Sequence, residues 1–255
     1  MDVRASLLGI SIPLASLQEI TEKSVGAIAA GSEPLTFVCA NPHSLVEAQK
    51  DLDFFRALKC ADLIVADGVG VTVMARISNI SIGPRITGAD YFFSLMTSLN
   101  ESGGGRVFFF GSSQHVLDLI SQRFVKTFPS LELCGVLSPP FGLWSEDENQ
   151  RMIEQINAAK PDVLWVGMTA PKQEKWVEAN RTKLSASVIG SIGAVFDFFA
   201  GTYPRAPDWM CQLGIEFVYR LLKEPKRMWR RNFISTPHFI SLVVKRHILD
   251  CENRA

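Results

Sequence analysis

Short apolar runs alternate along this chain with segments of helical periodicity. Five runs rich in β-forming residues, each followed by Asn, Asp or Gly, cover residues 35–39, 63–66, 106–110, 163–166 and 187–189. Apolar positions at helical spacing predict helices over 113–128 and 146–159. Continuous apolar strands with small or polar exits are typical of a parallel sheet between two layers of helices. The pattern therefore predicts an α/β fold, a Rossmann-like parallel sheet with helices on both faces.

The C-terminal part of the chain departs from this alternation. Residues 204–207 read Pro-Arg-Ala-Pro, and the chain beyond them has only helical periodicity, over about 208–223, 225–231 and 236–249. We therefore predict a Rossmann-like domain over residues 1–207 and a basic, α-helical appendage over residues 208–255.

The charges are divided between these two parts. The chain has 26 basic and 26 acidic side chains, but residues 220–255 contain nine basic and three acidic ones. Six of those nine lie within residues 220–231, beside Trp229 and Phe233. Such a cluster favours an anionic membrane surface over a merely solvated face or an oligomer contact. Nucleic acid is the competing polyanion, but no recognised binding motif accompanies the cluster, so we expect no nucleic-acid partner.

The composition argues against several other classes of protein. Nearly half of the residues are hydrophobic, enough for a buried core, yet no uncharged apolar run reaches 18 residues. The N-terminus lacks the basic and apolar regions of a secretory signal. The five cysteines form no C-x-x-C pair, and the four histidines show no metal-ligand spacing. We therefore expect reduced thiols, a cytosolic protein and no metal site.

Polar residues follow the strands at the edge where open parallel sheets bind ligands. Asp67 comes directly after residues 63–66, where a carboxylate can reach a ligand or cap the helix that begins near Gly68. Asn41 leaves the preceding strand and suits a sugar hydroxyl or a base edge, although an Asn-Pro turn is the simpler reading. Cys39 lies in an apolar strand, so we expect an inert buried thiol there and not a nucleophile.

Two later strand exits also carry candidate ligand groups. In the segment Gly167–Glu174, a strand exit is followed by a turn with proline and by the start of a helix. A helix N-terminus with Lys172 close to it suits a phosphate. The alternative is that the segment only caps the helix. Two further segments each contain a glycine turn. Ser191–Asp197 adds the carboxylate of Asp197, and Gly201–Pro207 adds the guanidinium of Arg205.

Two motifs are set aside. The D-x-D motif at Asp51–Asp53 opens an apolar helical run, so we expect a helix cap there and not a metal site. Gly103–Gly105 precedes a strand, and no glycine fingerprint for dinucleotides or nucleoside triphosphates is present.

Taken together, these segments resemble the WecG/TagA/CpsF family of bacterial glycosyltransferases. The likeness covers nearly the whole chain, because many short motifs follow in one order: Asn41, Ala61–Leu63, Asp67–Gly70, Arg85–Asp90, Phe109–Gly111, Pro171–Glu174, Gly193, Phe196–Asp197, Gly201, Arg205–Pro207, Gly214–Glu216, Tyr219–Leu221 and Glu224–Pro225. One departure is Cys39, where the family usually carries Thr.

The resemblance implies an inverting transferase made of a catalytic Rossmann-like domain and a membrane-associating appendage. Such enzymes pass a hexose or N-acetylhexosamine-type sugar from a UDP-sugar to a sugar on undecaprenyl diphosphate. They serve cell-surface polysaccharide biosynthesis, in the cytoplasm and peripheral on the inner face of the cell membrane. By resemblance Asp67 is the catalytic base. No metal or other cofactor is expected, because cationic side chains take the place of a metal ion. The implied substrate-binding positions are Asn41, Arg85, Gly111, Gln173 and Asp197, and those that meet the diphosphate and the membrane are Arg220, Arg227, Arg230 and Arg231.

Two other functions stay open at this point. A non-catalytic, membrane-docked nucleotide-sugar sensor or scaffold would keep the sheet-edge site and the basic tail without needing a base, and Cys39 favours it. A sugar-nucleotide oxidoreductase is weakened by the missing glycine fingerprint. The sequence does not determine the donor sugar, the acceptor, the linkage or the polysaccharide. It also does not determine the oligomeric state, and a homo-oligomer is possible.

Overall fold

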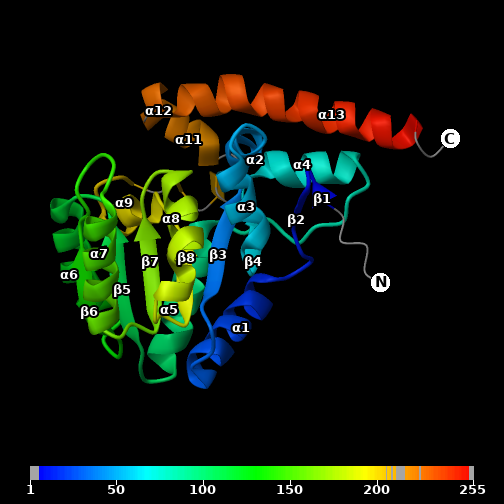
Figure 1. The fold of residues 1–255 in the computed structure, drawn as a ribbon. Coiled ribbons are helices and arrows are strands. Elements are labelled where there is room, and N and C mark those ends of the chain that lie inside the picture. The colour runs from blue at the N-terminus through cyan, green and yellow to red at the C-terminus, as the bar shows by residue number, and fades with distance from the viewer. Residues whose placement is uncertain (1–5, 205, 208, 211–215, 224, 253–255) are drawn as a thin grey trace.

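The computed structural model describes residues 6–204, 206–207, 209–210, 216–223 and 225–252. Its centre is a six-stranded parallel sheet in the order β4-β3-β8-β7-β5-β6 (Figure 1). All five predicted strands are present, and β6 is a sixth that the sequence did not indicate. The strands are β3 (Leu35–Ala40), β4 (Leu63–Ala66), β5 (Arg106–Gly111), β6 (Glu132–Leu137), β7 (Val163–Gly167) and β8 (Val188–Ser191).

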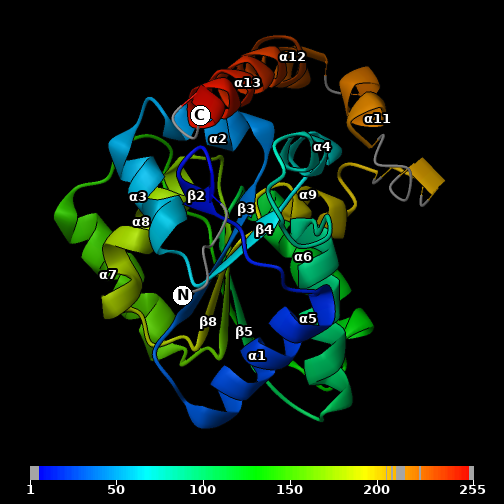
Figure 2. The ribbon, with the colours of Figure 1, turned by 90° about the vertical axis from the view of Figure 1, so that its right-hand side faces the viewer.

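Helices cover both faces of the sheet, as predicted. On one face lie α1 (Leu17–Ala30), α5 (Gly88–Glu101), α6 (Gln114–Thr127) and α9 (Val195–Ala200) (Figure 2). On the other lie α3 (Leu52–Cys60), α7 (Glu146–Ala158) and α8 (Lys172–Asn180), which is followed by a short 3-10 helix, η1 (Arg181–Lys183). Near the carboxyl ends of β3 and β4 stand α2 (Pro42–Ala48) and α4 (Val69–Ile77). A small antiparallel hairpin, β1 (Ser6–Leu7) and β2 (Ile10–Ser11), precedes α1.

The strand side chains alternate between two cores, one on each face of the sheet. Phe37 and Trp165 belong to the core under α1 and α5, and Val38 and Leu164 point to the opposite face. The Trp165 ring also crosses the neighbouring strand, because a Cβ at Gly190 would lie 2.2 Å from it. Both faces of the sheet are therefore buried, which explains why the strands are continuous apolar runs.

Short polar motifs fix the starts of several helices. Ser16 and Thr87 open α1 and α5 with capping boxes, in which Glu19 and Asp90 bond back to the cap residue. The D-x-D motif is confirmed as a helix cap: the Asp51 carboxylate accepts the backbone N–H groups of Asp53 and Phe54 at 3.1 and 3.0 Å.

The C-terminal appendage is helical where it is described. It comprises α11 (Glu216–Lys223), α12 (Pro225–Trp229), a π-helical turn η2 (Arg230–Ser235) and α13 (Thr236–Glu252). Figure 1 shows α13 lying across α2 and α4, and its Phe239 and Val243 are buried in the hydrophobic cluster that includes Leu45 of α2. Within the described part of the chain, no helix has the length and apolar content needed to cross a membrane.

Candidate active site at the carboxyl edge of the sheet

The register of β3 and β4 places Asn41 and Asp67 side by side. Ala40 pairs with Ala66, and the Asp67 N–H donates to the carbonyl oxygen of Ala40 at 2.9 Å. On the other side of β4, Ala66 forms an isolated parallel bridge with Arg85. Three of the predicted site residues, Asn41, Asp67 and Arg85, are thereby brought together in a row at the carboxyl edge of the sheet.

Asp67 is not the cap residue of the helix that follows it. The N-cap of α4 is Gly68, at a φ of 97°, and a glycine has no side chain to form a cap hydrogen bond. Asp67 immediately precedes this N-cap residue. Asp67 is half-buried at the rim of the sheet, which leaves its carboxylate in a position to act on a bound ligand.

Carboxylates gather around the thiol of Cys39. Burial, followed by the charges of Asp67, Glu174 and Asp90, raises the pKa of Cys39 well above its ordinary value. A thiol with a raised pKa stays protonated at neutral pH and is a poor nucleophile. This agrees with the prediction of an inert thiol. The Cys39 Sγ lies beside the start of α5, where a Cβ at Gly88 would be 3.5 Å from it.

Asn41 has a structural role at the start of α2. Its Oδ1 accepts the backbone N–H of Ser44 at 2.9 Å, and its own N–H donates to the Ser44 Oγ at 2.8 Å, so it is the N-cap of α2. The sequence predicted an Asn-Pro turn here, and the structure instead has the start of a helix, with Pro42 as its first residue. Because Oδ1 is engaged in the cap, the amide NH₂ is the part of the side chain suited to contact a ligand.

Gln173 is buried at the exit of β7, and its amide group is held in one orientation. Its Oε1 accepts the N–H of Met168 at 3.1 Å, and its Nε2 donates to Glu174 Oε1 at 2.8 Å. The second N–H of Nε2 is the group that this arrangement offers to a ligand. Glu174 is also buried. The sequence placed Glu174 at the start of a helix and gave no sign of its burial or of its bond with Gln173.

The turn after β8 brings further predicted residues to the same exit. Gly193 has a φ of 49°, and a Cβ there would lie 3.4 Å from Gln173 Oε1. Asp197 follows on α9 and is half-buried. Between these exits the Ser191 hydroxyl is buried with no hydrogen-bond partner among the described residues.

Gly111 is explained by backbone packing. It has a φ of 125°, and a Cβ there would lie 2.4 Å from the carbonyl oxygen of Gly167 at the exit of the neighbouring strand. Having no side chain, Gly111 can meet a ligand only through its backbone. Its glycine lets the ends of β5 and β7 approach each other closely.

The Gly111→Ala substitution is expected to destabilise the protein by about 2–3 kcal/mol, because it combines a left-handed φ with a backbone clash. Gly104→Ala is the matched control, since a Cβ at Gly104 would meet no atom within 4 Å. Chemical denaturation of both variants checks this. Equal stability of the two would show that the close approach of β5 and β7 is not required.

Several helices begin at this edge. Helices α2 and α4 follow the exits of β3 and β4, and α5 begins three residues after Arg85, with Gly88 beside Cys39. Helix N-termini carry partial positive charge suited to a diphosphate. Lys172 at the start of α8 was expected to meet a phosphate. Instead its Nζ donates to the Gly142 carbonyl at 2.8 Å and lies 3.8 Å from the centre of the Trp144 ring. It therefore fixes the loop between β6 and α7.

The four predicted appendage arginines lie on elements whose backbone is described. Arg220 is on α11, Arg227 on α12, and Arg230 and Arg231 on η2, but their side chains are outside the described part. Their described neighbours Trp229 and Phe233 are half exposed, with ring centres 4.4 Å apart.

The appendage also reaches the border of the site. Ser235 Oγ and His43 Nδ1 are 2.8 Å apart, which ties η2 to the first turn of α2.

The described residues contain no group of three or more His, Cys, Asp or Glu side chains placed to hold a metal ion. The acidic groups near Asp67 thus do not form such a site. The groups at this edge that suit a diphosphate are the Arg85 guanidinium and the helix N-termini.

Comparison with known proteins decides the family. The model of the glycosyl transferase WecG/TagA/CpsF family matches residues 5–251. The chain belongs to this family. The match extends from the β1–β2 hairpin into α13, so it includes both the Rossmann-like domain and the appendage.

Named relatives share substantial identity with this WecG/TagA/CpsF family member. A protein of Bacillus spizizenii (strain ATCC 23059 / NRRL B-14472 / W23) is 32% identical over 82% of this chain and 78% of its own length. One of Bacillus subtilis (strain 168) is 31% identical over 80% and 77%. One of Staphylococcus aureus (strain MW2) is 25% identical over 95% and 92%. All three are named N-acetylglucosaminyldiphosphoundecaprenol N-acetyl-beta-D-mannosaminyltransferase.

Proposed function

We propose that this WecG/TagA/CpsF family member is an inverting glycosyltransferase. It moves a hexose or N-acetylhexosamine-type sugar from a UDP-sugar to a sugar carried on undecaprenyl diphosphate, in cell-surface polysaccharide biosynthesis. The names of the relatives support this class of acceptor and of transferred sugar. The observation that carries the proposal is the position of Asp67, a carboxylate at the carboxyl edge of the sheet that is not the cap of α4.

Asp67 acts as the general base in this proposal. Its carboxylate takes the proton of an acceptor hydroxyl as that oxygen attacks the anomeric carbon of the donor. UDP leaves from the opposite face of the sugar, so the configuration at that carbon inverts. A positioned base typically contributes about 10²–10⁴-fold to the rate.

The leaving diphosphate gains negative charge as the bond to the sugar breaks. The Arg85 guanidinium, which is next to Asp67 through the Ala66 bridge, and the N-termini of α2, α4 and α5 stabilise that charge. Asn41 and Gln173 each offer amide N–H groups for the donor, and Asp197 is the carboxylate at the β8 exit that can accept from its hydroxyls. The scheme requires no metal ion or other cofactor.

The appendage holds the enzyme on the inner face of the cell membrane, where a lipid-linked acceptor is presented. Six basic residues lie within residues 220–231, and each contributes about 1 kcal/mol near an anionic leaflet. The half-exposed Trp229 and Phe233 suit the headgroup level of a bilayer. Since η2 is bonded to α2, a membrane-bound appendage lies next to the Asn41 end of the site.

A screen of UDP-sugars with a short-chain prenyl-diphosphate-linked acceptor, read by mass spectrometry, tests this function. We expect one donor to give an acceptor one sugar heavier, with release of UDP and with the same rate in EDTA. Transfer that is lost in EDTA and restored by Mg²⁺ or Mn²⁺ would contradict the metal-free scheme. Absence of transfer with every donor, despite UDP binding, would contradict the enzymatic function.

That last outcome would favour the second function, a membrane-docked nucleotide-sugar sensor. The observation in its favour is Cys39, a protonated thiol beside Asp67 where the family usually carries Thr. A thiol is a weaker hydrogen-bond partner than a hydroxyl, so a substrate contact is weakened at that position.

A further inference from the structure

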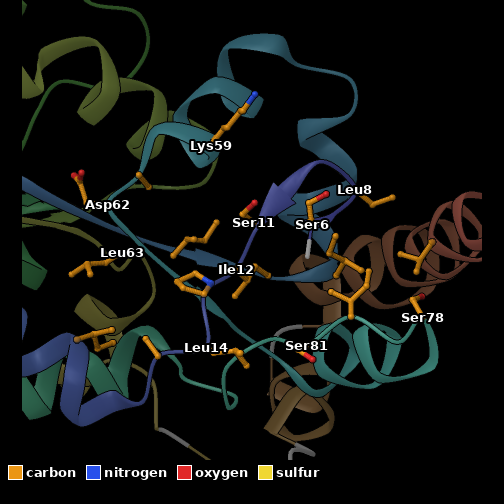
Figure 3. Close-up of a pocket in the computed structure, with 18 of the residues that line it drawn as sticks. Ser6, Leu8, Ser11, Ile12, Leu14, Lys59, Asp62, Leu63, Ser78 and Ser81 are labelled. Atoms are coloured by element: carbon orange, nitrogen blue, oxygen red, sulfur yellow. The ribbon is translucent and has the colours of Figure 1, made fainter. Parts of the chain in front are cut away.

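A cavity of about 1110 Å³ lies along the outer side of β4, the edge strand of the sheet (Figure 3). Its walls come from the β1–β2 hairpin, α1, the end of α3, the turn after α4 and α13. The site residues Asn41, Asp67, Arg85 and Gln173 do not line it. The cavity is therefore separate from the candidate active site, and the proposed reaction makes no use of it.

The floor of this cavity is apolar. Ile12, Ile20, Leu63 and Ile64 lie at its base and are only 3–5% exposed, and accessible apolar surface above them comes from side chains such as Leu14, which is 69% exposed. A floor of this kind, inside a volume of this size, suits a hydrocarbon chain.

The rim carries cations that the protein does not pair. Lys23, Lys59 and Arg246 line the cavity from α1, α3 and α13, and none of the three forms an ion pair or side-chain hydrogen bond with another described residue. Of the two lining acids, Asp62 pairs with Arg181 at 2.7 Å, whereas Glu19 accepts the N–H of Ser16 at 2.7 Å and keeps its negative charge. The three cations outnumber this one carboxylate, so the net charge at the rim is positive, which suits an anionic group.

One buried hydroxyl of the lining lacks a partner. Ser78, at the end of α4, is 9% exposed, and its Oγ makes no hydrogen bond with any described residue. Leaving a buried hydroxyl unpaired is unfavourable, so such a group points to a ligand or a water at this place. Three more serines, Ser6, Ser11 and Ser81, line the same cavity (Figure 3).

We propose that this cavity binds an anionic phospholipid of the membrane. Its anionic headgroup lies at the rim, where Lys23, Lys59 and Arg246 and the lining serines are, and its acyl chain covers the apolar floor. The proposal rests on the membrane location of the proposed function and adds a second, lipid-specific contact to it. Because Val243, Arg246 and His247 of α13 form one wall, the bound lipid joins the appendage to the β4 edge of the domain.

The test is a titration of the full chain with short-chain phosphatidylglycerol below its micellar concentration, followed by calorimetry. Phosphatidylcholine of the same chain length and glycerol phosphate are the two comparison ligands. We expect saturable binding of phosphatidylglycerol only. Lys59→Glu and Arg246→Glu should each weaken it roughly tenfold, and Ser78→Ala should weaken it by less. Lys126→Glu, an exposed reversal on α6 outside the cavity, is the matched control and should bind as the original protein does.

Each arm of the experiment decides one part of the proposal. Equal binding of glycerol phosphate would show a phosphate site that does not bind a lipid chain. Equal binding of phosphatidylcholine would show an apolar cleft that does not select for charge. Either result overturns the proposal. Unchanged affinity in both charge reversals would place the lipid elsewhere and also overturn the proposal.

The Lys59→Glu variant should still transfer sugar to the short-chain acceptor at the original rate. Failure of the cavity proposal is thereby distinguished from failure of the transferase function, which the donor screen detects with the unmodified chain.

Discussion

Replacing Asp67 by Asn is expected to lower kcat for sugar transfer by about 10²–10⁴-fold, with little change in the affinity for UDP. The amide has nearly the same shape as the carboxylate but cannot take a proton from the acceptor. The exchange leaves the N-cap residue of α4 in place, because that residue is Gly68. The backbone bond from Asp67 to Ala40 is also kept. Steady-state rates with a prenyl-diphosphate-linked acceptor, together with UDP titration, measure the two quantities separately.

Asp53→Asn is the matched control for this experiment. Asp53 belongs to the D-x-D motif at the start of α3, and its side chain is 72% exposed. The exchange removes a carboxylate without touching the sheet edge, so near-normal transfer is expected. If Asp53→Asn were the inactive variant and Asp67→Asn the active one, the D-x-D motif would be functional and the base would have to be reassigned.

Phe239→Ala is expected to lower the free energy of unfolding by about 3–5 kcal/mol, the usual cost of removing a fully buried phenyl ring. Phe239 is 0% exposed and lies in the hydrophobic cluster shared by α13, α2 and β3. The cavity left behind loosens α13 from α2, the helix that Asn41 caps. A fall in Tm and in the denaturant midpoint, accompanied by weaker transfer to a lipid-linked acceptor, is the expected pattern.

Phe141→Ala makes the same chemical change at an exposed position. Phe141 is 97% exposed in the loop between β6 and α7, so its loss removes almost no buried contact and should change the stability little. Equal destabilisation by the two substitutions would mean that α13 does not pack on the domain through Phe239.

The sheet was largely predictable, because its strands are buried on both faces. In β5, for example, Val107, Phe108 and Phe109 are all buried, and such a continuous apolar run is recognised without any alternation of polar residues. The β6 strand gave no such signal. It is at the edge of the sheet, begins with the exposed Glu132 and contains no fully buried residue.

The sequence predicted which residues of the candidate site lie at the same edge of the sheet, but not which partners their side chains have. Strand exits in a parallel sheet share one edge, so the proximity of Asn41 and Asp67 followed from the order of elements. Local spacing could not decide which residue caps α4, because that depends on the φ of Gly68. The partners of Lys172, Gly142 and Trp144, come from the separate loop between β6 and α7, which sequence periodicity does not encode.

The appendage was predicted to be helical from its periodicity, and its described part is. Its docking could not be predicted. In α13, Phe239 and Val243 are buried, whereas Ile240 and Val244 are exposed, and only the position of α2 decides between these two faces. The β1–β2 hairpin, with two residues in each strand, is too short for any periodic signal, so the cavity beside β4 was also outside what the sequence indicated.

A single-turnover experiment tests the central claim most directly. The original protein and Asp67→Asn are each mixed with the donor found in the UDP-sugar screen and the prenyl-diphosphate-linked acceptor, and the glycosylated lipid is quantified by mass spectrometry. We expect complete conversion by the original protein and almost none by Asp67→Asn at saturating, equally bound donor. Conversion by Asp67→Asn at the original rate would show that Asp67 is not the general base.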